Sequence, residues 1–87
     1  MAIRHIRAYD EFVDFITSLP TLQEIADFRF SEGTQSDITR LLDANRAGEI
    51  SPDDAAALDE YLRVEHLVRS AKIRALEKLE TSLTISE

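Results

Sequence analysis

The stretch SPDDAAALDEYLRVEHLVRSAKIRALEKL, residues 51–79, decides the fold. It contains no Gly, and its single Pro is the second residue, so nothing inside it breaks a helix. Ser51 is a good N-cap, and Pro52 suits the first helical position. Asp53 and Asp54 place negative charge at the positive end of the helix dipole. We therefore predict one helix over 51–79, about 29 residues and roughly 43 Å long.

The composition is that of a small helical protein. The chain has 87 residues, of which 44% are hydrophobic and 31% charged, and its two Gly and two Pro leave little room for β-turns. It has no Cys, which excludes disulfides, thiolate zinc sites and thiol catalysis. It contains no apolar run of about 20 residues and no signal-peptide pattern, so we expect no membrane association and a cytoplasmic location.

Local signals divide the rest of the chain into shorter helices. Pro20 stops one helix, and Thr21 with Glu24 forms a capping box that starts the next. Gly48 ends a third helix, because a left-handed glycine terminates many helices. We predict an extended arm over 1–9, short helices over 10–19, 21–29 and 31–46, the long helix over 51–79 and a polar tail over 80–87.

These elements predict a single all-α domain over residues 1–87, in which three short helices pack on one long C-terminal helix. Phe28 and Phe30 are expected to fill a corner of its core. A compact chain of this length has a radius of gyration near ~12 Å and a diameter of roughly 31 Å. The long helix would therefore extend beyond the globule by about two turns.

The C-terminal half of the long helix stays apolar where it leaves the globule. Exposed apolar surface of this kind usually marks an interface. We predict a non-catalytic protein–protein interaction module, which forms a homo-oligomer such as a dimer, or binds a partner protein, through this half. The expected interface residues are Val68, Ala71, Ala75, Leu76 and Leu79.

The charge is negative overall and unevenly distributed. The net charge of −7 argues against nucleic-acid binding, because phosphates repel an acidic protein. A basic strip nevertheless lies on the long helix, formed by Arg63, Arg69, Lys72, Arg74 and Lys78. Asp59 precedes Arg63 by four residues, as Glu65 precedes Arg69, and this order favours ion pairs along a solvated helix face.

The turn before the long helix has the spacing of a calcium loop. Residues 43–54, DANRAGEISPDD, resemble the twelve-residue EF-hand loop, with Gly48 at its sharp turn. The candidate metal ligands are the side chains of Asp43, Asn45 and Asp54 and the carbonyl of Glu49. Ala47 offers no oxygen at the fifth position, and Asp54 is short for the twelfth. A weak calcium-responsive helix–loop–helix module is the alternative function, against a plain helix stop and start with no metal.

No arrangement of residues in the sequence points to catalysis. The two histidines, His5 and His66, lack the spacing of HExxH or Glu-x-x-His metal motifs. The chain has no nucleophile elbow and no Gly-rich phosphate loop. We predict that the protein is not an enzyme and that it has no cofactor and no catalytic residue.

Residues 41–75 carry a moderately specific motif, N-R-x-G-x-[LIV]-[ST]-x-x-[DE], followed by a-L-D-x-[YL]-L-x-x-E-H-L. The matching positions are Asn45, Arg46, Gly48, Ile50, Ser51, Asp54, Leu58, Asp59, Tyr61, Leu62, Glu65, His66 and Leu67. This segment resembles a family of short, uncharacterised helical bacterial proteins, mostly cyanobacterial, which are often encoded beside an HNH-type endonuclease. The resemblance implies an antitoxin-like or nuclease-accessory role. An acidic protein that covers a basic nuclease surface is consistent with the net charge.

Overall fold

The computed structural model describes residues 7–85, with side chains described for residues 7–81. These residues form four helices and no strand: α1 (Arg7–Thr17), α2 (Leu22–Ala26), α3 (Glu32–Arg46) and α4 (Pro52–Ile85). The predicted all-α fold, with three short helices packed on a long C-terminal helix, is confirmed. Within the described residues, no helix is long and apolar enough to cross a membrane.

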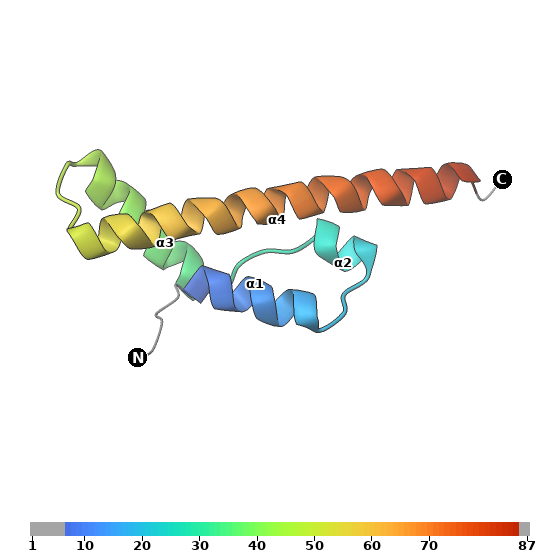
Figure 1. The fold of residues 1–87 in the computed structure, drawn as a ribbon, viewed down its shortest axis with the longest axis horizontal. Coiled ribbons are helices and arrows are strands. Elements are labelled where there is room, and N and C mark those ends of the chain that lie inside the picture. The colour runs from blue at the N-terminus through green and yellow to red at the C-terminus, as the bar shows by residue number, and fades with distance from the viewer. Residues whose placement is uncertain (1–6, 86–87) are drawn as a thin grey trace.

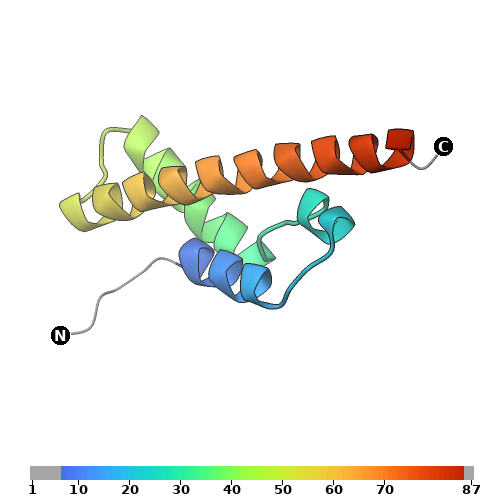
Figure 2. The ribbon, with the colours of Figure 1, turned by 45° about the vertical axis from the view of Figure 1, so that its right-hand side comes forward.

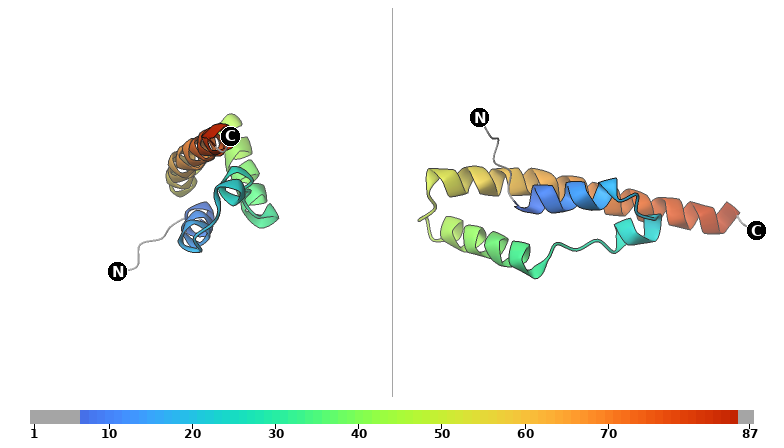
Figure 3. Two further views of the ribbon diagram at one scale, coloured as in Figure 1. Left: turned by 90° about the vertical axis from the view of Figure 1, so that its right-hand side faces the viewer. Right: turned by 90° about the horizontal axis from the view of Figure 1, so that it is seen from below.

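Helix α4 is the axis of the molecule, and the three shorter helices pack along it (Figures 1 and 2). α3 leads into α4 through a turn and runs back beside its first half, α1 lies beside its middle, and α2 lies beside its second half. Seen end on, α1 and α3 occupy different sides of α4 and leave part of its surface open (Figure 3). The radius of gyration of 15.9 Å and the dimensions of 56 × 31 × 19 Å describe a rod rather than the compact globule expected.

The core is small, and its central cluster combines buried aliphatic side chains with aromatic ones that are buried or partly buried. Phe12 of α1 packs with Val64 and Val68 of α4, and all three are buried. Phe28 and Phe30 pack against this cluster as predicted, and their ring centroids lie 5.0 Å apart in an edge-to-face arrangement. Edge-to-face contact of this kind adds to the gain from burial alone. The segment after α2 is thereby attached to α1 and α4 together.

The helix ends follow the local signals in the sequence. The amide of Thr21 donates to the Glu24 carboxylate, and the amide of Glu24 donates to the Thr21 hydroxyl, so the predicted capping box is present. Gly48 has a φ of +73°, which confirms its left-handed role at the end of α3. The hydroxyl of Ser51 accepts a hydrogen bond of 3.1 Å from the amide of Asp54, so Ser51 is the N-cap of α4.

The bounds of α1 differ from the predicted ones. α1 begins at Arg7 rather than at residue 10, because Ala8 lies in the interior on the same face as Phe12. Residues 7–9 are therefore helical instead of part of an extended arm, and residues 1–6 of that arm lie outside the described residues. α1 ends at Thr17, before the predicted residue 19, since Leu19 has a φ of +59° ahead of Pro20.

The bounds of the other helices also shift. α2 ends at Ala26 instead of residue 29, because Phe28 leaves the helix and its carbonyl accepts a 2.9 Å hydrogen bond from Lys72 Nζ of α4. α3 begins at Glu32, directly after its N-cap Ser31. α4 continues to Ile85, since neither Gly nor Pro follows residue 79, and the predicted tail is helical as far as it is described.

Glu11 connects α1 to the start of α3. Its carboxylate accepts hydrogen bonds from the Ser31 amide (2.8 Å), from the Ser31 hydroxyl (2.7 Å) and from the buried hydroxyl of Thr34. Burial raises the pKa of Glu11, but the hydrogen bonds from Thr34 and Ser31 and the nearby charge of Arg7 together lower it by more. The pKa therefore lies below its ordinary value, and the charged carboxylate holds the two helices together at neutral pH.

Candidate functional site

The interface predicted on α4 is only partly available to a partner. Val68 and Ala75 are buried inside the chain, while Ala71 and Leu79 are half-buried and Leu76 is exposed. The prediction is therefore corrected for Val68 and Ala75, which pack within the protein. The physical reason is the position of α2: the sequence predicted that the short helices pack on the first half of the long helix, whereas α2 lies along the C-terminal half of α4 (Figure 1).

Four large apolar side chains of α4 remain exposed. Leu67 is 56% exposed and lies alone, about 140° around the helix axis from Leu62, whereas the other three share one face. Leu62, Ile73 and Leu76 have 49%, 53% and 53% of their surface exposed. At about 100° per residue they lie within roughly 60° of one another around the helix axis and extend over about 21 Å. We call these three side chains the α4 stripe. Sequence reasoning missed Leu62 and Ile73, although the spacing of residues 62, 73 and 76 places them on one helical face.

The charged residues around the α4 stripe are paired along the helix. Arg69 lies between Leu62 and Ile73 and forms a 2.6 Å ion pair with Glu65. Arg63 forms a 2.8 Å ion pair with Asp59. The two ion pairs expected from the sequence are thus confirmed, and they leave the basic strip partly neutralised. The stripe is an apolar surface interrupted by one Glu–Arg pair.

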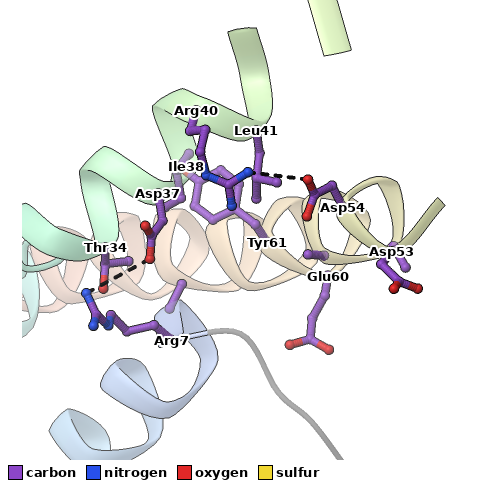
Figure 4. A pocket seen from close by; sticks show the side chains of 13 residues that line it. Arg7, Thr34, Asp37, Ile38, Arg40, Leu41, Asp53, Asp54, Glu60 and Tyr61 are labelled. Carbon is purple, nitrogen blue, oxygen red and sulfur yellow. Dashed lines mark hydrogen bonds and ion pairs between the residues drawn. The ribbon is translucent and has the colours of Figure 1, made fainter. Parts of the chain in front are cut away.

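A groove of about 590 Å³ lies where α1, α3 and the first turns of α4 meet (Figure 4). Its apolar lining comes from Ala8, Ile38, Leu41, Ala56, Ala57 and Tyr61, and its polar lining from Arg7, Thr34, Asp37, Arg40, Asp53, Asp54 and Glu60. Burial and then the charge of Glu65 raise the pKa of Tyr61, so its phenol stays neutral at physiological pH. Tyr61 is therefore not activated as a nucleophile or base.

The arginines of the groove are engaged by acids of the same groove. Arg40 of α3 pairs with Asp54 of α4 at 3.3 Å, and Arg7 lies 4.0 Å from Asp37. Figure 4 shows the side chains of Asp53 and Glu60 pointing away from both arginines. These ion pairs join α3 to α4 and α1 to α3, so the groove is better explained as a packing seam than as a binding pocket.

The candidate calcium ligands are not brought together in the turn over 43–54. Asp43 pairs with Arg46 at 3.6 Å, and Asp54 pairs with Arg40 of α3. Gly48 and Glu49 donate their amides to the carbonyls of Asn45 and Ala44, which is the Schellman arrangement of a helix end. Among the described residues, no group of three or more His, Asp or Glu side chains is placed to hold a metal ion. Helix capping accounts for this turn.

Comparison of the chain with known proteins identified no related protein. No protein-family model matches the chain, and searches of the curated proteins and of the solved structures found no match. The resemblance of residues 41–75 to a bacterial family therefore stays a prediction. By its fold and its surface, the chain is a small all-α protein with one long helix that presents an apolar stripe.

Proposed function

We propose that the protein is a small, non-catalytic protein–protein interaction module and that the α4 stripe is its binding face. The single observation that carries the proposal is the exposure of Leu62, Ile73 and Leu76 along one side of α4. Isolated apolar side chains on a surface need no explanation, but three within about 60° of one another on one helix form an apolar face that can pack against another helix.

The remaining surface supports binding over catalysis. The groove at the start of α4 holds arginines paired with acids, and its one tyrosine is neutral. The side chain with a lowered pKa, Glu11, is used in holding α1 to α3.

A finer form of the proposal is an antitoxin-like or nuclease-accessory role with a basic partner. It is supported by the net charge of −7 and by the position of that charge, since residues 1–60 hold thirteen acids and five bases. A basic protein would be attracted to this acidic part of the surface, and the attraction would weaken as salt is added.

Photo-crosslinking in the native cell tests the proposal. A photoreactive phenylalanine analogue replaces Ile73, and a control chain carries it at Lys78, which lies about 160° around the helix from Leu76. We expect a discrete crosslinked protein from position 73 and none from position 78. A proposal based on the stripe is wrong if both positions give the same products, or if position 73 gives none.

A second variant separates binding from folding. Ile73→Asp places a charge on an exposed position, so the thermal midpoint should change little while the crosslink is lost. Loss of the crosslink together with a large fall in the midpoint would mean that Ile73 supports the fold rather than a partner.

A further inference from the structure

We infer that the partner of the α4 stripe is a second copy of this chain, whose α4 lies antiparallel to the first. The inference rests on the proposed function, since it names the occupant of the same surface. It is drawn from the spacing of the stripe within α4, from the charges between its leucines, and from the length of helix that the contact must cover.

The spacing of the stripe selects an antiparallel register. Leu62 and Leu76 are each seven residues from Arg69, and α4 extends over Pro52–Ile85, so its midpoint falls beside Arg69 as well. A two-fold axis through this point places Leu62 of each copy opposite Leu76 of the other. The register that pairs the leucines is therefore also the register that overlaps the two α4 helices from end to end.

The overlap matters because the stripe alone is small. Three half-exposed side chains fall well below the ~800 Å² that each partner contributes to a standard interface. The two α4 helices then run side by side over roughly 51 Å, since each has 34 residues, although Leu58, which lies in line with Leu76, is buried within its own chain and adds no contact. Full overlap also brings the end of α4 that projects beyond α2 alongside the start of the other α4 (Figure 1).

The charges within the stripe favour the antiparallel arrangement over the parallel one. In a parallel pair, Glu65 would face Glu65 and Arg69 would face Arg69, and like charges opposite each other destabilise a helix pair. The antiparallel register still brings Arg69 of the two copies together at the axis, but it places each Glu65 opposite Ile73 instead of opposite the other Glu65. Each Arg69 then has its own Glu65, at 2.6 Å, and Glu65 of the second copy about one turn from the axis, so that two carboxylates accompany the two guanidinium groups. The helix dipoles also oppose each other, which is favourable.

The first part of α4 is acidic and its later part is basic, which also favours the antiparallel arrangement. Residues 51–62 hold four acids and no base, whereas residues 63–78 hold five bases and two acids. Antiparallel packing places the acidic start of each α4 beside the later part of the other, and parallel packing would place acidic start against acidic start. Complementary charge sets the orientation of such contacts more than their strength.

Single-cysteine crosslinking tests the register, because the chain has no cysteine of its own. Three variants carry the cysteine on the stripe face, namely Leu62→Cys, Arg69→Cys and Leu76→Cys, and a fourth, Lys78→Cys, carries it on the opposite side of α4 as a control. We expect Arg69→Cys to form a disulfide-linked dimer by itself, because it lies at the axis. An equimolar mixture of Leu62→Cys and Leu76→Cys should give the mixed dimer in preference to either homodimer, and Lys78→Cys should stay monomeric.

Light scattering on the unmodified chain from about 10 to 500 µM accompanies the crosslinking, and Leu62→Asp should weaken the dimer at least about tenfold. Homodimers of Leu62→Cys in preference to the mixed dimer would establish a parallel pair and overturn the inference. A strict monomer over the whole range, without crosslinks, would also overturn it. In that case a specific crosslink from position 73 in the cell would leave the proposed function standing with a different partner, whereas its absence would remove both.

Discussion

Removal of the Glu11 carboxylate should unfold the junction between α1 and α3 while leaving the helices themselves intact. The change is Glu11→Ala. In the native protein this carboxylate accepts three hydrogen bonds, two from Ser31 and one from Thr34, across 20 and 23 residues of sequence. Helix α3 is otherwise joined to α1 at this end by the exposed Arg7–Asp37 pair, whose atoms are 4.0 Å apart. Such exposed pairs contribute little to stability.

The size of the effect follows from which donors are left without an acceptor. The amide and hydroxyl of Ser31 lie at the surface and can turn to water, so each contributes about 0.5 kcal/mol. Thr34 is 1% exposed and keeps only the Ser31 hydroxyl, at 3.1 Å, as a partner, so the loss of the carboxylate costs about 1–2 kcal/mol at this position. Loss of negative charge at the start of α3 adds roughly 0.3–1 kcal/mol. We expect a total loss of about 2–4 kcal/mol, and a fall in the melting temperature of roughly 10–30 °C.

Denaturant unfolding monitored by circular dichroism measures this loss, with Asp14→Ala as the matched control. Asp14 is an exposed carboxylate on the same helix, so its removal should change the unfolding free energy by less than about 0.5 kcal/mol. If Glu11→Ala lies within about 0.5 kcal/mol of the unchanged protein, or if both variants lose the same amount, the assigned role of Glu11 is refuted.

The same carboxylate predicts a pH dependence with a definite sign. The pKa of Glu11 is lower in the folded protein than its ordinary value of 4.5, so the unfolded chain takes up the proton first. The contribution of Glu11 is therefore complete above its ordinary pKa and is lost as the pH falls through the lower, folded value. The stability difference between the unchanged protein and Glu11→Gln should be constant near pH 7 and should shrink in acid. A difference that grows below pH 4.5 would contradict the direction of the shift.

Three further variants, studied by thermal and denaturant unfolding, test the structural roles of Leu19, Gly33 and Lys72. Leu19→Gly should stabilise by about 0.5 kcal/mol, because Leu19 is 88% exposed at a φ of +59°, and Leu19→Ala should give no such gain. Gly33→Ala should stabilise by about 0.5 kcal/mol, since a Cβ at this position meets only the movable end of the Arg7 side chain; destabilisation by more than about 0.5 kcal/mol would show that Arg7 cannot move. Lys72→Met should destabilise by about 1–2 kcal/mol and raise hydrogen exchange in α2, because it removes the 2.9 Å hydrogen bond to the Phe28 carbonyl; unchanged exchange would contradict this role.

The sequence was sufficient for features that depend on near neighbours. The capping box of Thr21 and Glu24, the left-handed Gly48 and the Ser51 cap all involve residues within five positions of one another, and all are present. The ion pairs of Asp59 and Glu65 with residues four positions later belong to the same class. Local signals of this kind determine where helices begin and end, and they gave the all-α fold.

The faces of α4 could not be read in the same way. Apolar residues lie all around this helix, so its periodicity does not say which of them α2 will cover. That choice depends on the path of the chain after Pro20 and on Phe28, whose carbonyl is held by Lys72 at a separation of 44 residues. Val68 was therefore expected at an interface and lies in the core. The bonds from Ser31 and Thr34 to Glu11 likewise had no sequence signal, because three common polar residues far apart define no motif.

The separation between core and stripe also decides how the proposed interface can be studied. Val68 and the aromatic cluster lie on the side of α4 that faces α1 and α2, whereas the α4 stripe points away from them. Leu62 and Leu76 are about half exposed and lie outside the core, so their substitution by Asp should lower the stability of the single chain only slightly. If such a variant is folded but no longer associates, the loss can be assigned to the α4 stripe. Glu11→Ala should do the reverse, because it lowers the unfolding free energy without altering any residue of the stripe. The two kinds of variant thus distinguish a protein that folds but cannot associate from one that fails to associate because it is unfolded.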